Sequence, residues 1–233
     1  MNLSEFGEGE SWQEMWARTQ TVPQRISLKL SLVHKTSDPY ATFVGLIDEA
    51  ISHISIQMAR NKNVLKGMGE DQLTTNVIAY LHGMGFVALF EANNGGNCDI
   101  SIHGADDMVW LGEAKIYRSG RNLLSGLQQL VDRYATGLPN QDRGSLIIYI
   151  LTKNAKKVMR TWNSRLVIKM TKGKVLSAPG NDLSFKTTVE HAGSGRDLLI
   201  KHVPFVLFHE PTETGPAPNW NSDAPVRLGA HRA

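Results

Sequence analysis

The sequence predicts a mixed α/β fold, because two kinds of hydrophobic periodicity recur along the chain. Residues 97–117 alternate apolar and polar side chains, as the two strands of a β-hairpin do. Residues 145–152 form a short apolar run, which is typical of a strand buried on both faces. In 39–61 and 70–82 the apolar residues recur at helical spacing. With 233 residues, 41% of them hydrophobic, the chain is long enough for one well-buried core.

We expect residues 1–66 to form an N-terminal extension of helices and a strand that packs on the core. Residues 8–20 suggest a short helix with two tryptophans on one face. Residues 25–33 alternate leucine or isoleucine with polar residues, which predicts a half-buried strand. A helix from Pro39 to about Asn61 follows, opened by a serine or an aspartate.

The predicted core covers residues 67–209. It begins with a helix from about Glu70 to His82, whose first turn holds acidic residues that the positive end of a helix favours. A strand at 86–92 and the hairpin come next, and then a helix that Gly137 and Pro139 end.

The C-terminal part of the core is basic. After the apolar strand we expect a helix over 154–164, and then a basic hairpin over 165–177. A late strand over 196–208 contains Pro204, which places it at an edge or a bulge. Residues 210–233 contain four prolines and few apolar residues, so we expect a disordered tail.

Polar residues interrupt the two strands of the hairpin. Asp99 lies opposite the apolar face of the first strand, and Glu113 and Lys115 project from one face of the second. For Asp99 to lie directly opposite Glu113, the turn must hold an odd number of residues, for example 105–107, or contain a bulge. The two aspartates of this turn are then ordinary turn residues.

This arrangement suits the hydrolysis of phosphodiesters. A hard cation such as Mg²⁺ prefers oxygen ligands, and two carboxylates on neighbouring strands can supply them. A lysine on the same face can help to orient an attacking water or stabilise the charge that develops on phosphorus. The hairpin therefore predicts a magnesium site beside a lysine.

At these residues the sequence resembles the PD-(D/E)XK nuclease superfamily, also called restriction-endonuclease-like. The resemblance rests on Asp99, on GEAK at 112–115, on the preceding helix with Glu70, and on the following helix with Gln128 and Gln129. It implies a three-layer α/β/α core with a mixed central sheet, in which residues 70–152 run helix, three strands, helix, strand. Where the family has a proline before the aspartate, this chain has a cysteine.

The resemblance also implies roles for single residues. Asp99 and Glu113 would be metal ligands, the carbonyl of Ala114 a third candidate ligand, and Lys115 the catalytic lysine. Glu70 would match the helical glutamate that many members use as a further ligand or to orient water. The cofactor implied is Mg²⁺, for which Mn²⁺ would substitute.

The helix after the lysine strand matches less well. Some exonuclease-like members have a glutamine there, followed four residues later by a tyrosine. Here Gln129 and Tyr134 are five residues apart, so the tyrosine match fails. One glutamine, Gln129 or Gln128, could still face the site, and we include Gln129 among the candidate catalytic residues.

Positive charge is concentrated downstream of the hairpin. Between Asp142 and Asp182 there is no acidic residue. We expect nucleic acid to bind this segment, although a solvated face would have the same composition. The candidate nucleic-acid-binding residues are Lys153, Lys156, Lys157, Arg160, Lys169, Lys172 and Lys174.

The expected function is that of a Mg²⁺-dependent endonuclease that cuts DNA rather than RNA, in a role such as restriction or antiphage defence. The alternative is a catalytically inactive nucleic-acid-binding or assembly subunit that keeps the fold. A homodimer or an activating protein partner is compatible with either. The single cysteine excludes an intramolecular disulfide, and no apolar run predicts a membrane span, so we expect a cytoplasmic protein.

Overall fold

The computed structural model describes residues 21–93, 97–169 and 173–210. The helices are α2 (Val22–Leu30), α3 (Pro39–Arg60), α4 (Glu70–Gly83), α5 (Gly120–Gln129) and α6 (Ala155–Lys169), with short helical turns η2 (Val33–Lys35) and η3 (Leu130–Tyr134). The strands are β1 (Val87–Asn93), β2 (Asn97–His103), β3 (Val109–Ile116), β4 (Arg143–Ile150), β5 (Gly173–Val175), β6 (Phe185–Glu190) and β7 (Asp197–Val206).

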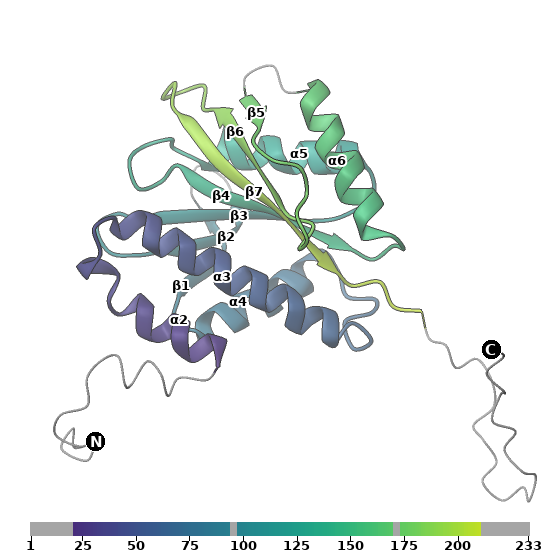
Figure 1. Ribbon diagram of the computed structural model, residues 1–233, viewed down its shortest axis with the longest axis horizontal. Helices are drawn as coiled ribbons and strands as arrows, with labels where there is room; N and C mark the ends of the chain where they lie inside the picture. The colour runs from purple at the N-terminus through teal and green to yellow at the C-terminus, as the bar shows by residue number, and fades with distance from the viewer. Residues whose placement is uncertain (1–20, 94–96, 170–172, 211–233) are drawn as a thin grey trace, which may run out of the picture.

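The strands form one mixed sheet of seven, in the order β1-β2-β3-β4-β7-β6-β5. The central pairs β3–β4 and β4–β7 are parallel, and the outer pairs are antiparallel. Helices α2, α3 and α4 lie on one face of the sheet, and α5 and α6 lie on the other (Figure 1). The protein is therefore a three-layer α/β fold with a mixed sheet, as the sequence predicts.

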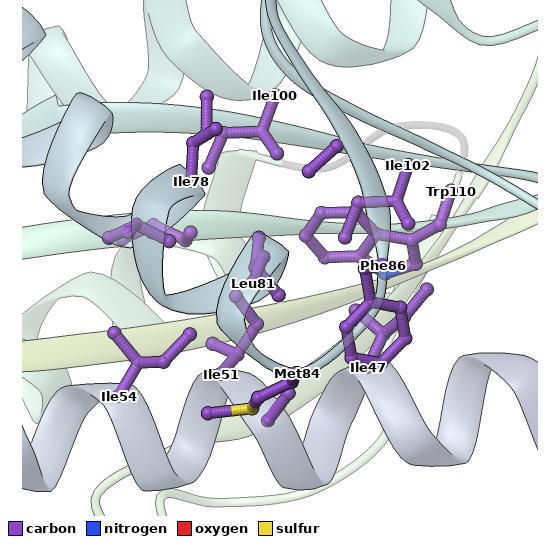
Figure 2. Close-up of a cluster of buried hydrophobic side chains, with 14 of the residues drawn as sticks. Ile47, Ile51, Ile54, Ile78, Leu81, Met84, Phe86, Ile100, Ile102 and Trp110 are labelled. Carbon is purple, nitrogen blue, oxygen red and sulfur yellow. The ribbon is translucent and has the colours of Figure 1, made fainter. Parts of the chain in front are cut away.

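A large apolar cluster joins α3 and α4 to the sheet. Figure 2 shows isoleucines of α3 facing Leu81 of α4, with Ile100, Ile102 and Trp110 of the hairpin above them. The apolar spacing predicted for α3 produces this face, and Asp38 begins the helix by accepting a hydrogen bond from Ala41 N at 2.9 Å. Helix α4 presents one apolar side in the same way, so the two helices cover the sheet together.

A second cluster fills the space under α5 and α6. Strand β4 contributes to both clusters, because Ile147 and Tyr149 point to the first and Ile148 and Ile150 to the second. Seven of its eight residues are buried, as the apolar run predicts. Cys98 is a fully buried core residue as well.

The predicted strand at 25–33 is wrong, because these residues belong to helix α2 and the turn after it. Ile26 and Leu30 are one helical turn apart, and both pack on the first cluster. Pro23 in the first turn also favours the helix. The apolar residues of this segment do alternate with polar ones, but the residues that are buried lie at helical spacing.

The predicted basic hairpin at 165–177 is also wrong. Residues 165–169 are the end of α6, because Trp162 and Leu166 continue its buried face. Strand β5 pairs instead with β6, a strand that the sequence analysis does not predict. The buried side chains of Phe185 and Thr187 give β6 the alternation that could have indicated it.

The late strand is β7, which lies inside the sheet between β4 and β6. Leu199 N donates a backbone hydrogen bond to Asp142 O, just before β4, and Leu207 N donates one to Ile150 O of β4, so the nitrogen of Pro204 points to the other side of β7. The pairing with β6 ends at Phe185 opposite His202. Pro204 therefore leaves no hydrogen bond unmade, because the strand is locally an edge there.

Some predictions fall outside the described residues: the helix over 8–20, the tail beyond residue 210, and Lys172. Within the described residues, no helix has both the length and the hydrophobicity that crossing a membrane requires.

Candidate active site at the end of strand β3

The β2–β3 hairpin has the register that the sequence predicts. Ile100 pairs with Gly112 and His103 with Val109, and Gly104 N donates to Met108 O at 2.8 Å. The turn is therefore the three residues 105–107, and the same register places Asp99 opposite Glu113. Both aspartates of the turn have a left-handed backbone, with φ of 52° and 56°.

The ladder between β2 and β3 ends at the pair of Ile100 and Gly112. Beyond this pair, a side chain of β2 takes over from its backbone as the hydrogen-bond partner of β3. The Asp99 carboxylate accepts a hydrogen bond from Ala114 N at 2.8 Å. A residue's carbonyl points to the same edge of a strand as its N–H, so the Ala114 carbonyl lies on the Asp99 side of β3. This hydrogen bond fixes the Asp99 side chain beside β3.

Lys115 lies among three carboxylates. Its Nζ is 2.5 Å from Glu113 Oε1, 3.4 Å from Glu70 Oε1 and 3.6 Å from Asp99 Oδ2. The Lys115 side chain is 15% exposed and that of Glu113 only 2%. We call these four residues the acidic cluster. It unites all the candidate residues that the sequence places on α4, β2 and β3, apart from Ala114, whose N–H contacts the cluster.

Glu70 reaches the acidic cluster from the other layer. It is the first residue of α4, and its Oε2 accepts a hydrogen bond from Ile116 N at 2.6 Å. One turn later the Thr74 hydroxyl donates to Glu70 O at 2.9 Å and lies 3.1 Å from the Tyr149 hydroxyl of β4. The sheet therefore holds the first turn of α4 through a buried contact that the sequence does not reveal.

Burial and mutual repulsion shift the pKa values of the cluster. Burial, and then the charge of Asp99, raise the pKa of Glu113 to about 7, although Lys115 opposes the shift. Burial also raises the pKa of Asp99, against the Ala114 N–H and Lys115. For Lys115, burial lowers the pKa, but the Glu113 hydrogen bond and the three carboxylates outweigh it and the net shift is upward. The lysine is therefore charged at neutral pH.

Two candidate catalytic residues each have a buried side-chain oxygen without a hydrogen-bond partner among the described residues. These oxygens are Glu113 Oε2 and Gln129 Oε1. Gln129 is the last residue of α5 and half-buried, whereas Gln128 is exposed. Within the described part of the chain Gln129 makes no hydrogen bond to the acidic cluster, so the structure does not join it to the other candidate catalytic residues.

Gly126 packs against the Lys115 side chain, and the sequence analysis does not identify it. A Cβ on this residue of α5 would lie 2.8 Å from Lys115 Cγ and 3.2 Å from Lys115 Cε. The helix can therefore pack closely on the lysine side chain only because residue 126 has no side chain. A glycine inside a predicted helix, one layer from a candidate lysine, is the signal that could have indicated it.

The oxygen donors of the acidic cluster are of the chemical type that suits a hard divalent cation, but their arrangement does not match a metal site. Three carboxylates, one of them with the unpartnered Glu113 oxygen, and a backbone carbonyl are the ligand types that Mg²⁺ prefers. In the described residues, however, no group of three or more acidic, histidine or cysteine side chains stands in a metal-holding arrangement. The Lys115 ammonium lies between the carboxylates instead.

The predicted nucleic-acid-binding residues are spread over α6 and its surroundings. Lys156, Lys157, Arg160 and Lys169 are exposed on α6, and Lys174 is exposed on β5. Lys153 Nζ is 2.6 Å from Glu210 Oε2 and lies over the ring of Phe208, so it is less free to bind a phosphate.

Comparisons of the chain with protein-family models, with curated proteins and with solved structures find no match.

Proposed function

We propose that this protein is a metal-dependent nuclease that hydrolyses phosphodiester bonds, most plausibly in DNA. One observation supports this above all others. Three carboxylates from α4, β2 and β3 converge on the ammonium of Lys115, and one buried oxygen of Glu113 has no partner in the described structure. Buried charges of this kind are costly for folding, so their convergence favours a catalytic or binding role.

The resemblance to the PD-(D/E)XK superfamily supports the same reading. Helix α4, strands β1, β2 and β3, helix α5 and strand β4 follow one another in the order that this resemblance implies. The residues that would hold Mg²⁺ are Asp99, Glu113 and Glu70, with the Ala114 carbonyl. When bound, the metal would supply Lewis-acid stabilisation of a phosphoryl oxygen and a more acidic water.

The charge balance of the cluster favours a cation. When all four residues are ionised, three negative charges face one positive charge, in a site where Glu113 is almost fully buried. Burial, and to a smaller extent repulsion between the carboxylates, raises the pKa values of Glu113 and Asp99, and opposite charge that enters this site would relieve the repulsion.

Lys115 is the residue that we expect to act on the substrate. Its ammonium is charged, its stem is held by Gly126, and three carboxylates surround its Nζ. A positive charge fixed in a site of low exposure interacts strongly with the negative charge that develops on a phosphate during hydrolysis. Asp99 and Glu70 orient the site through the backbone N–H groups of Ala114 and Ile116.

The test is cleavage of supercoiled plasmid and of single-stranded DNA and RNA, with Mg²⁺, with Mn²⁺ and with EDTA. Wild-type protein is compared with Glu113→Gln and Lys115→Met. The matched control is Glu49→Gln, which removes an exposed carboxylate on α3, remote in sequence from the cluster. We expect metal-dependent cutting by the wild type and the control, and a loss of at least about a hundredfold in the two cluster variants.

Calorimetric titration with Mn²⁺ gives a readout that does not depend on activity. Asp99→Asn and Glu113→Gln should weaken Mn²⁺ binding, whereas Glu49→Gln should leave it unchanged. A wild type that neither binds the metal nor cuts any of these substrates would contradict the proposal. Nucleic-acid binding without cutting would then favour the non-catalytic subunit.

A further inference from the structure

A cationic groove lies between α5 and α6, and the acidic cluster does not use it. Its volume is about 720 Å³. Arg121 and Leu124 line it from α5, and Arg160, Ser164, Arg165 and Lys169 line it from α6. We call it the α5–α6 groove. Two of its four cations, Arg121 and Arg165, are absent from the nucleic-acid-binding residues that the sequence predicts.

The positive charges of the α5–α6 groove have no carboxylate partner among the described residues. In the described chain, no carboxylate lies within ion-pair distance of its three arginines or its lysine. Neither helix contains an acidic residue anywhere in its length. Four cations around one hollow create a positive potential that attracts anions, so the groove suits a ligand with several negative charges.

One arginine reaches across the groove. Arg165 extends from α6 onto the first residue of α5, where a Cβ on Gly120 would lie 2.8 Å from its Nη1 and 2.9 Å from its Nε. The missing side chain of Gly120 leaves room for the guanidinium. A guanidinium can bind a phosphate with two parallel hydrogen bonds.

The α5–α6 groove is close to the acidic cluster along the chain. Ile116 donates its N–H to Glu70, and Arg121 follows five residues later. Five residues span at most about 18 Å, which is a few phosphates along one nucleic-acid strand. On the side of α5 that faces the sheet, Gly126 contacts Lys115. One helix therefore separates the cationic groove from the lysine.

We propose that the α5–α6 groove binds the sugar-phosphate backbone of the nucleic acid whose phosphodiester reaches the acidic cluster, which rests on the proposed nuclease function. Arginine, lysine and serine side chains are the usual partners of backbone phosphates. Among the described residues that line the groove there is no aromatic side chain to stack on bases, so phosphate contacts are the interaction that its lining supplies.

The test is binding of a fluorescent DNA duplex in EDTA, followed by anisotropy over about 50 to 200 mM salt. Arg121→Ala/Arg165→Ala is compared with wild type and with the control Lys62→Ala/Lys66→Ala, which removes two exposed lysines between α3 and α4. We expect the groove variant to bind about tenfold more weakly or worse at about 0.1 M salt, and its salt slope to fall by about 1.8. The control should match the wild type.

A second pair, Arg160→Ala/Lys169→Ala, should reproduce the loss without touching the packing of Arg165 on Gly120. Equal binding by the wild type and both groove variants would overturn the groove proposal. It would also be overturned if the groove variants lost binding to phosphatidylserine vesicles but kept binding to the duplex. The nuclease proposal has its own readout, because Glu113→Gln should keep duplex binding in EDTA and lose cleavage in Mg²⁺. If the wild type binds the duplex through the groove but does not cleave it, the nuclease proposal is contradicted and the groove proposal is not.

Discussion

The buried carboxylate of Glu113 should make the protein less stable at neutral pH than the same fold without that charge. Glu113→Gln keeps the size of the side chain and a hydrogen-bonding oxygen, but it replaces the ionisable carboxyl group by a neutral amide. The Glu113 side chain is 2% exposed, and its Oε2 has no partner in the described residues. We therefore expect the variant to be more stable than the wild type in metal-free buffer above pH 7.

The magnitude follows from the shifted pKa. The pKa of Glu113 rises from 4.5 to about 7 on folding, with burial and the charge of Asp99 as the main causes. Since a tenfold change in proton affinity corresponds to about 1.4 kcal/mol, ionised Glu113 costs the folded state about 3 kcal/mol. The attraction of Lys115 is already contained in this value.

The sign of the pH dependence is opposite to that of an ordinary salt-bridged carboxylate. Below about pH 4.5 Glu113 is protonated in both states, so the cost is absent. Between pH 4.5 and about 7 the unfolded chain releases its proton first, and wild-type stability falls. Above about pH 7 the full cost is present. The stability gained by Glu113→Gln should therefore be near zero at pH 4.5 and greatest at pH 8.

Urea unfolding in EDTA, at several pH values, measures this difference. A gain of about 3 kcal/mol corresponds to a rise in the midpoint of about 1 M or more. Glu49→Gln, which loses only weak exposed ion pairs, should stay within about 1 kcal/mol of the wild type at every pH. A Glu113→Gln protein less stable than the wild type at pH 8, or a difference that does not change with pH, would refute the reasoning.

Three further predictions follow from single contacts. Gly126→Ala should displace Lys115 and slow plasmid cleavage about a hundredfold, while the urea midpoint changes little, because better helix propensity offsets part of the crowding. Tyr149→Phe should lower the free energy of unfolding by about 1 kcal/mol in urea, since one buried hydrogen bond to Thr74 is lost. Cys98 is fully buried and its pKa is raised to about 12, so mass spectrometry should find it alkylated by iodoacetamide only in urea.

The hairpin could be predicted from the sequence because its information is local. Strand alternation alone places Glu113 and Lys115 on one face. A turn with an odd number of residues then places Asp99 opposite Glu113. The apolar spacing of α3 and α4 and the apolar run of β4 are local signals as well, and these elements are where the sequence predicts them.

The sequence predictions are wrong where helical and strand periodicities fit the same residues, or where the partner of a strand lies in another part of the chain. In α2 a residue spacing of four and a spacing of two share Ile26 and Leu30, and only the packing of the first cluster decides between them. Strand β5 pairs with β6, which follows it in the chain. It does not pair with residues 165–169, because these residues form the end of α6. A glycine inside a predicted helix could mark Gly126 as a close approach, but the partners of Gly126 and Gly120, Lys115 and Arg165, become known only from the packing.

Glu70 is the cluster residue with the least sequence support, because an acidic residue in the first turn of a helix is favourable with or without a site. The structure shows why the helix-end explanation is not sufficient. Both of its carboxylate oxygens are engaged by β3, one by Ile116 N and one by Lys115 Nζ. The N-terminus of α4 therefore lies at the carboxyl end of β3, and α5 begins four residues beyond Ile116. Two helix N-termini, both favourable to anions, thus flank the strand end that presents the lysine.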